Sequence, residues 1–295
     1  MLNFYEFTLE NVDTLRSIIA ASGRMGCEAS PVCRFLWKDR YPTQWCEIDS
    51  YLITRYSSAF AFPVGPDDRE RLKSVLEVLF RYTAEEGIPL EFWGLTREDM
   101  TLMEELFPGK FEFTTSRDEW DYIYRSEDLI GLQGKKYQAK RNHISRFRRE
   151  YSYEYQDITE ENKAICREAA RQWMEENVQP ETKSEYESEL RAISLALENF
   201  EALRLRGGLL MVNDKVAAFT IGGEISSRVF DVYFEKAMEE FNGAYAVIHQ
   251  EFARRNLAEY EFINREEDLG IPGLRKAKLS YHPAILLEKY SAVLR

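Results

Sequence analysis

The chain has 295 residues, of which 44% are hydrophobic, 14% aromatic and 31% charged, so it holds enough apolar material for two cores and enough charge to cover them. Its net charge of −12 excludes a protein that coats nucleic acid, because phosphate binding needs clustered Lys and Arg, and no sequence-specific DNA binding is expected. The N-terminus lacks the basic flank and apolar run of a signal peptide, and no uncharged stretch could span a bilayer, so we expect a cytoplasmic protein without a transmembrane segment.

The cysteines do not form a recognisable metal or redox motif. Cys27, Cys33, Cys46 and Cys166 are irregularly spaced with no CxxC pair, and only three histidines are present to join them. We interpret them as reduced structural thiols and expect no metal site. A cysteine nucleophile is the alternative, although no sequence signature accompanies any of the four.

The first half of the chain alternates between strand patterns and amphipathic helix patterns. Asp67 and Glu70 have capping-box spacing at the start of one helix, and Thr96 with Asp99 indicates the start of another. In chain order, the expected elements are strands at 45–56 and 58–64, a helix through 72–79, a strand at 89–93, a helix through 102–106, and strands at 111–115 and 120–124.

Residues 134–149 form a basic segment, GKKYQAKRNHISRFRR, with seven Lys or Arg and no acid. On a helix, Tyr137, Ile144, Phe147 and Tyr151 would pack against the protein and leave the cations available to an anion. Four ligands fit this pattern: tRNA, a lipid headgroup, a nucleotide phosphate, or the protein's own acidic surface. The anion-binding candidates are Lys136, Lys140, Arg141, His143 and Arg148.

The second half shows a longer series of elements. A short polar turn at 213–215 between two apolar runs indicates an antiparallel hairpin. In chain order, we expect a strand at 151–156, two helices through 165–174 and 190–200, strands at 209–212, 216–221 and 229–234, a helix through 244–252, a strand at 259–264, a helix at 274–279 and an apolar segment at 284–294.

This order resembles the GNAT acetyltransferase-like fold, in which the fourth and fifth strands splay apart and the helix between them points its N-terminus at a ligand's phosphates. The first half repeats the last part of the same order, which indicates a duplication. We therefore predict an α/β (α+β) protein of two tandem GNAT-like domains, each a mixed, mostly antiparallel sheet flanked by helices. The domains are predicted at 1–130 and 131–295, the second preceded by the basic helix.

Two segments carry a more specific resemblance. The residues GKKY, KRNHI and Phe147 within 134–147, and NREEDLGIPGLRKAK at 264–278, resemble a bacterial family of unknown function similar to the C-terminal domain of phosphatidylglycerol lysyltransferase. The resemblance covers nearly the whole chain. It implies the tandem GNAT-like fold and a distant relation to the Fem-type enzymes, which move aminoacyl groups from charged tRNA. The usual acetyl-CoA phosphate loop is not matched, because residues 238–244 keep one glycine and add two acids.

The resemblance directs attention to the gap between the splayed strands of the second half. Acyl transfer to an amine needs a base and a group that donates a proton to the leaving group, and we assign these roles to Glu235 and Tyr281. A solvated strand end and a phenol at the edge of the core are the structural alternatives, and His249 is interpreted as structural. The donor-binding candidates are Tyr233, Asn242, Gly243, Asn264, Arg265 and Lys278.

These residues predict an acyl- or aminoacyltransferase that acts from an acyl-CoA or aminoacyl-tRNA donor onto an amine or hydroxyl acceptor. No tightly held cofactor is implied. The expected partners are a small-molecule or aminoacyl-tRNA substrate, with an anionic lipid headgroup as a further candidate. The alternative is a binding or regulatory protein that retains the GNAT-like fold without catalysis.

Overall fold

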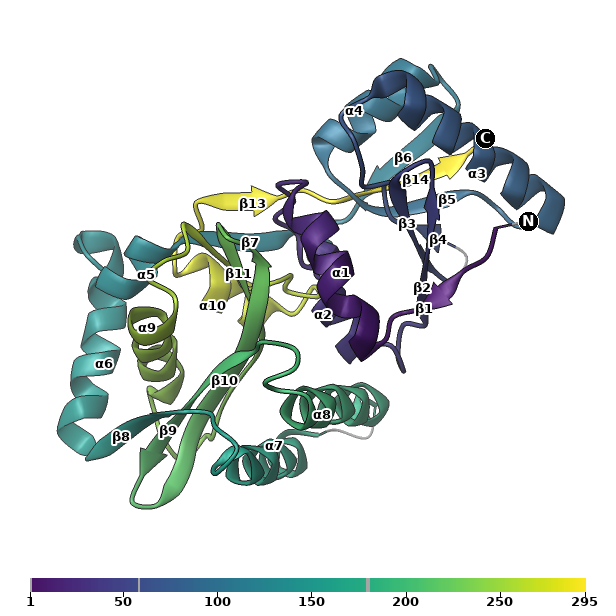
Figure 1. The fold of residues 1–295 in the computed structure, drawn as a ribbon. Coiled ribbons are helices and arrows are strands. Elements are labelled where there is room, and N and C mark those ends of the chain that lie inside the picture. Colours follow the sequence, from purple (N-terminus) through teal and green to yellow (C-terminus); the bar gives the residue numbers. More distant parts are fainter. Residues whose placement is uncertain (1, 58, 179–180) are drawn as a thin grey trace. The chain divides into compact units, whose positions relative to one another are not determined.

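The computed structural model describes residues 2–57, 59–178 and 181–295. It divides into two compact units, whose elements are drawn in Figure 1. Unit 1 comprises Met1–Asp121, Glu267–Arg275 and Leu286–Arg295, and unit 2 comprises Tyr122–Glu266 and Lys276–Ile285. This division differs from a single boundary near residue 130, because two segments close to the C-terminus belong to unit 1. None of the helices in the described ranges is long and apolar enough to cross a bilayer.

The sheet of unit 1 is completed by a strand from the end of the chain. β14 lies between β5 and β6 and is antiparallel to both. β4 and β5 are parallel, and the other neighbours are antiparallel. In the order in which they lie in the sheet, the strands are β1 (Tyr5–Glu6), β2 (Thr43–Ile48), β3 (Tyr51–Tyr56), β4 (Ala59–Phe60), β5 (Glu91–Leu95), β14 (Tyr290–Leu294) and β6 (Phe111–Thr115).

The helices of unit 1 are α1 (Leu9–Ala20), α2 (Pro31–Leu36), α3 (Arg69–Glu86) and α4 (Arg97–Leu106). The apolar stripe predicted along 72–79 is buried in the core of this unit. The cap of α3 is Asp68, which accepts a hydrogen bond from the Arg71 amide at 3.1 Å, so the predicted start at Asp67 was one residue early. α4 has the predicted capping box between Thr96 and Asp99.

The single strand expected at 45–56 is a hairpin. Asp49 and Ser50 have φ angles of 48° and 66°, which turn β2 back onto β3. Such two-residue turns usually contain glycine, and its absence from this pair concealed the turn in the sequence. The strand expected at 58–64 begins on a residue outside the described ranges and is otherwise limited to β4.

The second sheet, which accounts for the strands of unit 2, contains β13 (Ile285–Leu287), β7 (Asp121–Arg125), β12 (Phe262–Asn264), β11 (Val229–Ala237), β10 (Lys215–Ser226), β9 (Arg206–Val212) and β8 (Tyr153–Asp157), in that order. β11 and β12 are parallel, and the other pairs for which a register is established are antiparallel. β7, predicted as the last strand of the first domain, pairs with β12 in this sheet. β14, predicted as part of the second domain, instead belongs to the sheet of unit 1.

The helices of unit 2 cover both faces of its sheet. α7 contacts β10 and β11, and in Figure 1 α7 and α8 lie together on one side of the sheet while α9 lies on the other. α6 packs against α9 and buries Ile144 and Phe147, as the pattern of the basic segment predicts. The bounds are α5 (Ser126–Gly131), α6 (Gln138–Glu150), α7 (Lys163–Asn177), α8 (Lys183–Glu198) and α9 (Ala244–Asn256), followed by α10 (Pro272–Leu279).

Candidate functional site

The candidate site of unit 2 lies where β11 and β12 separate. The two strands pair only from Val229 with Phe262 to Asp231 with Asn264. Beyond that pair, β12 ends, whereas β11 continues to Ala237 without this neighbour. On this side of β11, the residues beyond Asp231 are therefore available for contacts other than hydrogen bonds to β12.

A β-bulge at Tyr233 turns the side chains of β11 at this point. Ile221 of β10 pairs with Phe234, but the next residue, Gly222, pairs with Val232, so the register shifts by one residue at Tyr233. Phe230 packs on Phe252 of α9 at 5.8 Å between ring centroids. Because side chains alternate along an unbulged strand, Glu235 would point away from α9; the bulge reverses this and aims Glu235 at the helix.

Glu235 is held by two side chains from other elements. Its Oε1 accepts from Arg265 Nη2 at 2.7 Å, and its Oε2 lies 3.1 Å from His249 Nδ1. Burial alone would raise the pKa of Glu235, but Arg265 and then His249 outweigh it and lower the pKa to about 2. A carboxylate this acidic is a weak proton acceptor at neutral pH, so this geometry does not favour the predicted role of Glu235 as the base.

The Glu235 carboxylate determines which ring nitrogen of His249 carries the proton. Burial, followed by the positive charge of Arg265, lowers the pKa of His249, so the ring is neutral near pH 7. The ionised Glu235 fixes the proton on Nδ1, which leaves a lone pair on Nε2. Nε2 is buried and has no hydrogen-bond partner among the described residues. The arrangement is that of a general base with its orienting carboxylate, a role that differs from the structural one predicted for His249.

Tyr281 completes this cluster. Its ring lies 4.9 Å from the His249 ring, and the Arg265 guanidinium lies 5.3 Å from its centroid. Burial raises the pKa of Tyr281, so the phenol keeps its proton at any physiological pH. A neutral phenol beside a neutral imidazole fits the predicted role of Tyr281 as a proton donor.

The basic segment contributes one side chain to the same cluster. Lys140 Nζ lies 3.8 Å above the ring centroid of Tyr281. Burial, and then the charge of Arg265, lower the pKa of Lys140 to about 8. An ammonium with this pKa is partly neutral in mildly alkaline solution, unlike an ordinary lysine.

We therefore expect Lys140 to react faster than other lysines with an amine-directed reagent. Limiting acetic anhydride at pH 8, followed by peptide mass spectrometry, should show modification of Lys140 several-fold above that of the exposed Lys215, because only the neutral amine is nucleophilic. Equal modification of the two lysines would contradict the lowered pKa.

The other cations of the basic segment mostly contact the protein itself. Lys136 pairs with Asp128 at 3.4 Å, and Arg148 pairs with Glu251 at 3.0 Å. Arg141 donates to the carbonyl oxygen of Gly134 at 2.8 Å, whereas His143 is exposed. These contacts match the alternative in which the basic segment is neutralised by the protein's own acids, and an external anion remains a prediction.

The remaining predicted residues lie around the separated strands. Tyr233 and Asn264 are buried, and Asn264 Oδ1 accepts from the Glu266 amide at 2.7 Å. Lys278 Nζ donates to the carbonyl oxygens of Arg265 and Glu266 at 2.5 and 3.2 Å. The ammonium therefore stabilises the turn after β12, and its hydrogen bonds go to the backbone and not to a ligand.

The loop before α9 shows no phosphate cradle of the usual kind. Asn242 is exposed, and Gly243 caps α9 with a φ of 97°, a conformation that a side chain would strain. Glu240 pairs with Lys215 at 3.4 Å, so an acid from this loop is partly neutralised at the surface.

A second buried charge cluster lies in unit 1. Lys289 Nζ lies 2.7 Å from Asp121 and 3.7 Å from Glu267, pairs with Glu28, and donates to Cys27 Sγ at 3.3 Å. Ligand atoms of Cys27, Glu28 and Asp121 lie within 4.8 Å of one another, a spacing that suits a metal. The Lys289 ammonium already supplies the positive charge at their centre.

The charged loop after β12 also forms ion pairs in unit 1. Asp268 accepts from Arg275 Nη2 at 2.7 Å and lies 3.5 Å from Arg117, and Arg275 bridges to Asp118 at 2.6 Å. The alternating charges of the segment therefore have a structural use, with Arg275 as the partner of Asp268.

The two mostly antiparallel sheets, their flanking helices and the separated parallel strands define a protein of the GNAT-like class. The family described as "Phosphatidylglycerol lysyltransferase, C-terminal" matches residues 20–293, and the chain belongs to this family.

Solved structures agree with this assignment. A conserved protein of unknown function from Bacteroides thetaiotaomicron is 42% identical, with 100% of each chain covered and a TM-score of 0.95. L-PGS from Bacillus licheniformis is 15% identical over 96% of this chain and 91% of its own, with a TM-score of 0.64. FemX is 9% identical over 99% and 98% of the two chains, with a TM-score of 0.63. The last two likenesses show the shared fold.

The match to a curated relative covers a smaller share of that relative than the matches to the solved structures do. An uncharacterised protein of Mycoplasmoides gallisepticum is 23% identical over 214 residues, which are 69% of this chain and 61% of the relative. The match therefore spans less than two thirds of that protein.

Proposed function

We propose that this chain is an acyl- or aminoacyltransferase in which His249 is the general base. The observation that carries the proposal is the buried His249 Nε2, which has no partner in the described part of the chain, on a ring whose Nδ1 faces an ionised Glu235. The family name refers to a lysyltransferase, and the proposal extends to this chain only the transfer of an acyl or aminoacyl group.

In the proposed reaction, His249 acts first as the base and Tyr281 then acts as the proton donor. His249 Nε2 takes the proton of the acceptor amine or hydroxyl, whose nitrogen or oxygen then bonds to the donor carbonyl carbon. The bond from that carbon to the thiol sulfur of an acyl-CoA, or to the ribose oxygen of an aminoacyl-tRNA, breaks. Tyr281 gives the leaving group its proton and is reprotonated from His249, so the protons balance. The cations Lys140 and Arg265 stabilise the developing oxyanion.

The proposal is tested by donor screening followed by substitution. Acetyl-CoA, a long-chain acyl-CoA and lysyl-tRNA are first compared by thermal shift, because a ligand that prefers the folded state raises its stability. Transfer of the radiolabelled acyl group from the stabilising donor to an amine or hydroxyl acceptor is then measured. Stabilisation by one donor class distinguishes the two chemistries.

In this assay His249→Gln should lower kcat by about 10²- to 10⁴-fold, the usual contribution of general base catalysis. Arg254→Gln is the control on the same helix, since Arg254 is exposed and has no assigned role, and it should leave kcat unchanged. Activity should persist below the ordinary pKa of histidine and fall only at more acidic pH, because burial and Arg265 lower the pKa of His249. Full activity of His249→Gln would reject the base, and no transfer from any donor would favour the non-catalytic binding protein.

A further inference from the structure

Arg34 of α2 carries a buried positive charge in unit 1. The residue is 7% exposed, and its Nε and Nη1 atoms have no hydrogen-bond partner among the described residues. The ion pairs formed within 2–57, 59–178 and 181–295 do not include this guanidinium. Because a cation removed from water is costly unless it is paired, this environment favours an added negative charge.

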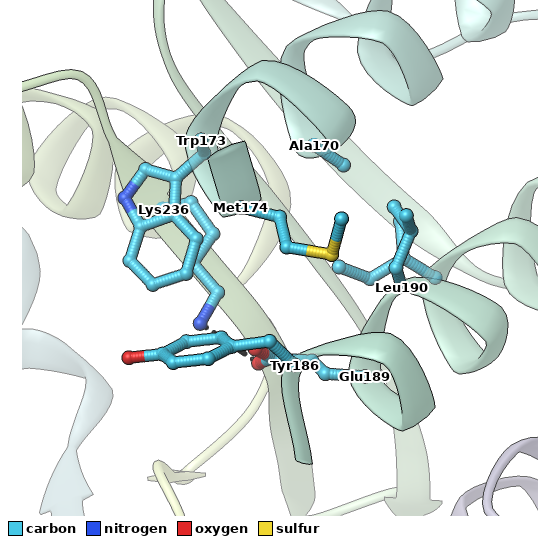
Figure 2. Close-up of a pocket in the computed structure, with 8 residues that line it drawn as sticks. Ala170, Trp173, Met174, Tyr186, Glu189, Leu190 and Lys236 are labelled. Carbon is cyan, nitrogen blue, oxygen red and sulfur yellow. Dashed lines mark ion pairs between the residues drawn. The ribbon is translucent and has the colours of Figure 1, made fainter. Parts of the chain in front are cut away.

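Other enclosed cations of the chain show how such a charge is stabilised elsewhere. Lys289 Nζ lies 2.7 Å from Asp121 in unit 1. In unit 2, Lys236 Nζ lies 2.8 Å from Glu189 Oε1, as Figure 2 shows. Each of these lysines has a carboxylate at hydrogen-bond distance, whereas Arg34 has aromatic rings as its neighbours.

The Arg34 guanidinium lies over the face of Tyr56. Its central carbon is 4.4 Å from the Tyr56 ring centroid and 6.0 Å from that of Phe7. Aromatic faces attract a cation through their quadrupole, but they do not replace the hydrogen bonds of its N–H groups. Tyr56 Oη is also buried without a hydrogen-bond partner in the described ranges. Burial raises the pKa of Tyr56 although the Arg34 charge opposes it, so the phenol keeps its proton and can donate it in a hydrogen bond.

Trp45 adds a third donor on the same face of the sheet. In the register of β2 and β3, Trp45 is opposite Thr54 and Thr43 is opposite Tyr56. Trp45 and Tyr56 therefore point to one face as diagonal neighbours, roughly 7–8 Å apart. Trp45 Nε1 is buried with no partner among the residues that the structure describes, and an indole N–H can only donate. Three side chains thus offer one positive charge and several hydrogen-bond donors.

We propose that Arg34, Tyr56 and Trp45 bind a small, singly charged anion made of acceptor atoms, a halide or a carboxylate, between α2 and the sheet of unit 1. One negative charge balances the guanidinium, and the neutral phenol and indole complete its hydrogen bonds. Glu28 is an acid close enough to act on this phenol, but it already pairs with Lys289.

The anion would enter by a movement of the aromatic rings. The polar atoms of Tyr56 and Trp45 are enclosed, but both residues are only partly buried, so a turn of either ring opens a path from solvent. The site is independent of the proposed base, since its residues belong to unit 1 and His249 belongs to unit 2.

The test compares unfolding in different sodium salts at one ionic strength. Wild-type protein is unfolded with urea in the sodium salt of MES, a sulfonate too bulky for this site, and with part of that salt replaced by chloride or acetate. Circular dichroism and tryptophan fluorescence are recorded. The folding equilibrium constant should rise about tenfold when the anion reaches ten times its dissociation constant. A larger gain with chloride would identify a halide site, and a larger gain with acetate a carboxylate site.

Three variants separate binding at this site from general salt effects. Arg34→Met should abolish the gain, and in MES alone it should be at least as stable as the wild type, because it removes an unpaired buried charge. Tyr56→Phe keeps the ring, removes the hydroxyl and should weaken anion binding by about tenfold. Arg40→Met is the matched control, since Arg40 also lies beside a tyrosine, 5.7 Å from the Tyr41 ring, but is exposed; it should respond as the wild type does.

Two results would overturn the proposal. One is a wild type whose stability does not change when chloride or acetate replaces MES. The other is an equal gain in the wild type and in Arg34→Met, because salts also act on the whole protein surface. If Arg34→Met does not fold, Tyr56→Phe decides, and an unchanged dependence on both anions in that variant would contradict the site.

Discussion

Lys289→Met should lower the free energy of unfolding by about 3–5 kcal/mol, the cost of leaving buried charges without their partner. The Lys289 side chain is 4% exposed and is paired with Glu28, Asp121 and Glu267. Its replacement leaves the fully buried Asp121 carboxylate without its cation, beside the carboxylates of Glu28 and Glu267. Burial by itself would lower the pKa of Lys289, but the neighbouring carboxylates, Asp121 first, raise it well above its ordinary value.

Urea unfolding followed by circular dichroism measures this loss. Lys110→Met is the matched control, because Lys110 is an exposed lysine of the same unit and its replacement should change stability by about 0.5 kcal/mol or less. The double variant Lys289→Met with Asp121→Asn should lose less than the sum of the two single variants, since the asparagine carries no charge to be left unpaired. A single variant Lys289→Met that loses less than about 1 kcal/mol would show that the cluster is effectively solvated.

Arg265→Met should destabilise unit 2 by a similar amount, about 3–5 kcal/mol. It removes the 2.7 Å ion pair to the buried Glu235 and leaves that carboxylate with the neutral His249 as its remaining partner. Arg228→Met is the matched control, because Arg228 pairs with Glu261 at the surface of the same unit and should contribute about 1 kcal/mol or less. A double variant with Glu235→Gln should recover part of the loss.

The same pair predicts a dependence of stability on pH. The folded pKa of Glu235 is about 2, below its ordinary value of 4.5, so the unfolded state binds the proton more tightly. The stabilisation, about 3 kcal/mol, is fully present above pH 4.5 and is lost as the pH falls toward about 2. In Arg265→Met this decline between pH 4.5 and 2 should be much smaller. An unchanged acid profile in that variant would show that Arg265 does not set the pKa of Glu235.

Much of the local structure could be predicted because it depends on neighbours in the sequence. The capping box of Thr96 and Asp99 and the apolar stripe of α3 follow from hydrogen bonding and burial within a few residues. The resemblance of 134–147 and 264–278 to a known family also identified the correct fold class. The cytoplasmic location, the duplication and the external anion of the basic segment stay predictions.

The site depended on contacts that no local pattern contains. His249 occupies a helix position among buried residues, so its periodicity alone indicated a structural histidine. Its pairing with Glu235 requires the bulge at Tyr233, which an alternating strand pattern does not reveal. The basic segment likewise suggested five exposed anion-binding residues, whereas the fold turned Lys140 toward Tyr281 and paired Lys136 and Arg148 with the protein's own acids.

The sequence by itself determined the fold class and most helices and strands, because these depend on short-range periodicity and on a long characteristic segment. Only the tertiary structure decided that β14 completes the sheet of unit 1 and that β7 pairs with β12, since a strand's partner is chosen by long-range hydrogen bonding and burial. The tertiary structure also decided which charges are buried together. Burial and proximity set the pKa values of Glu235, His249 and Lys140, and neither can be derived from composition or spacing.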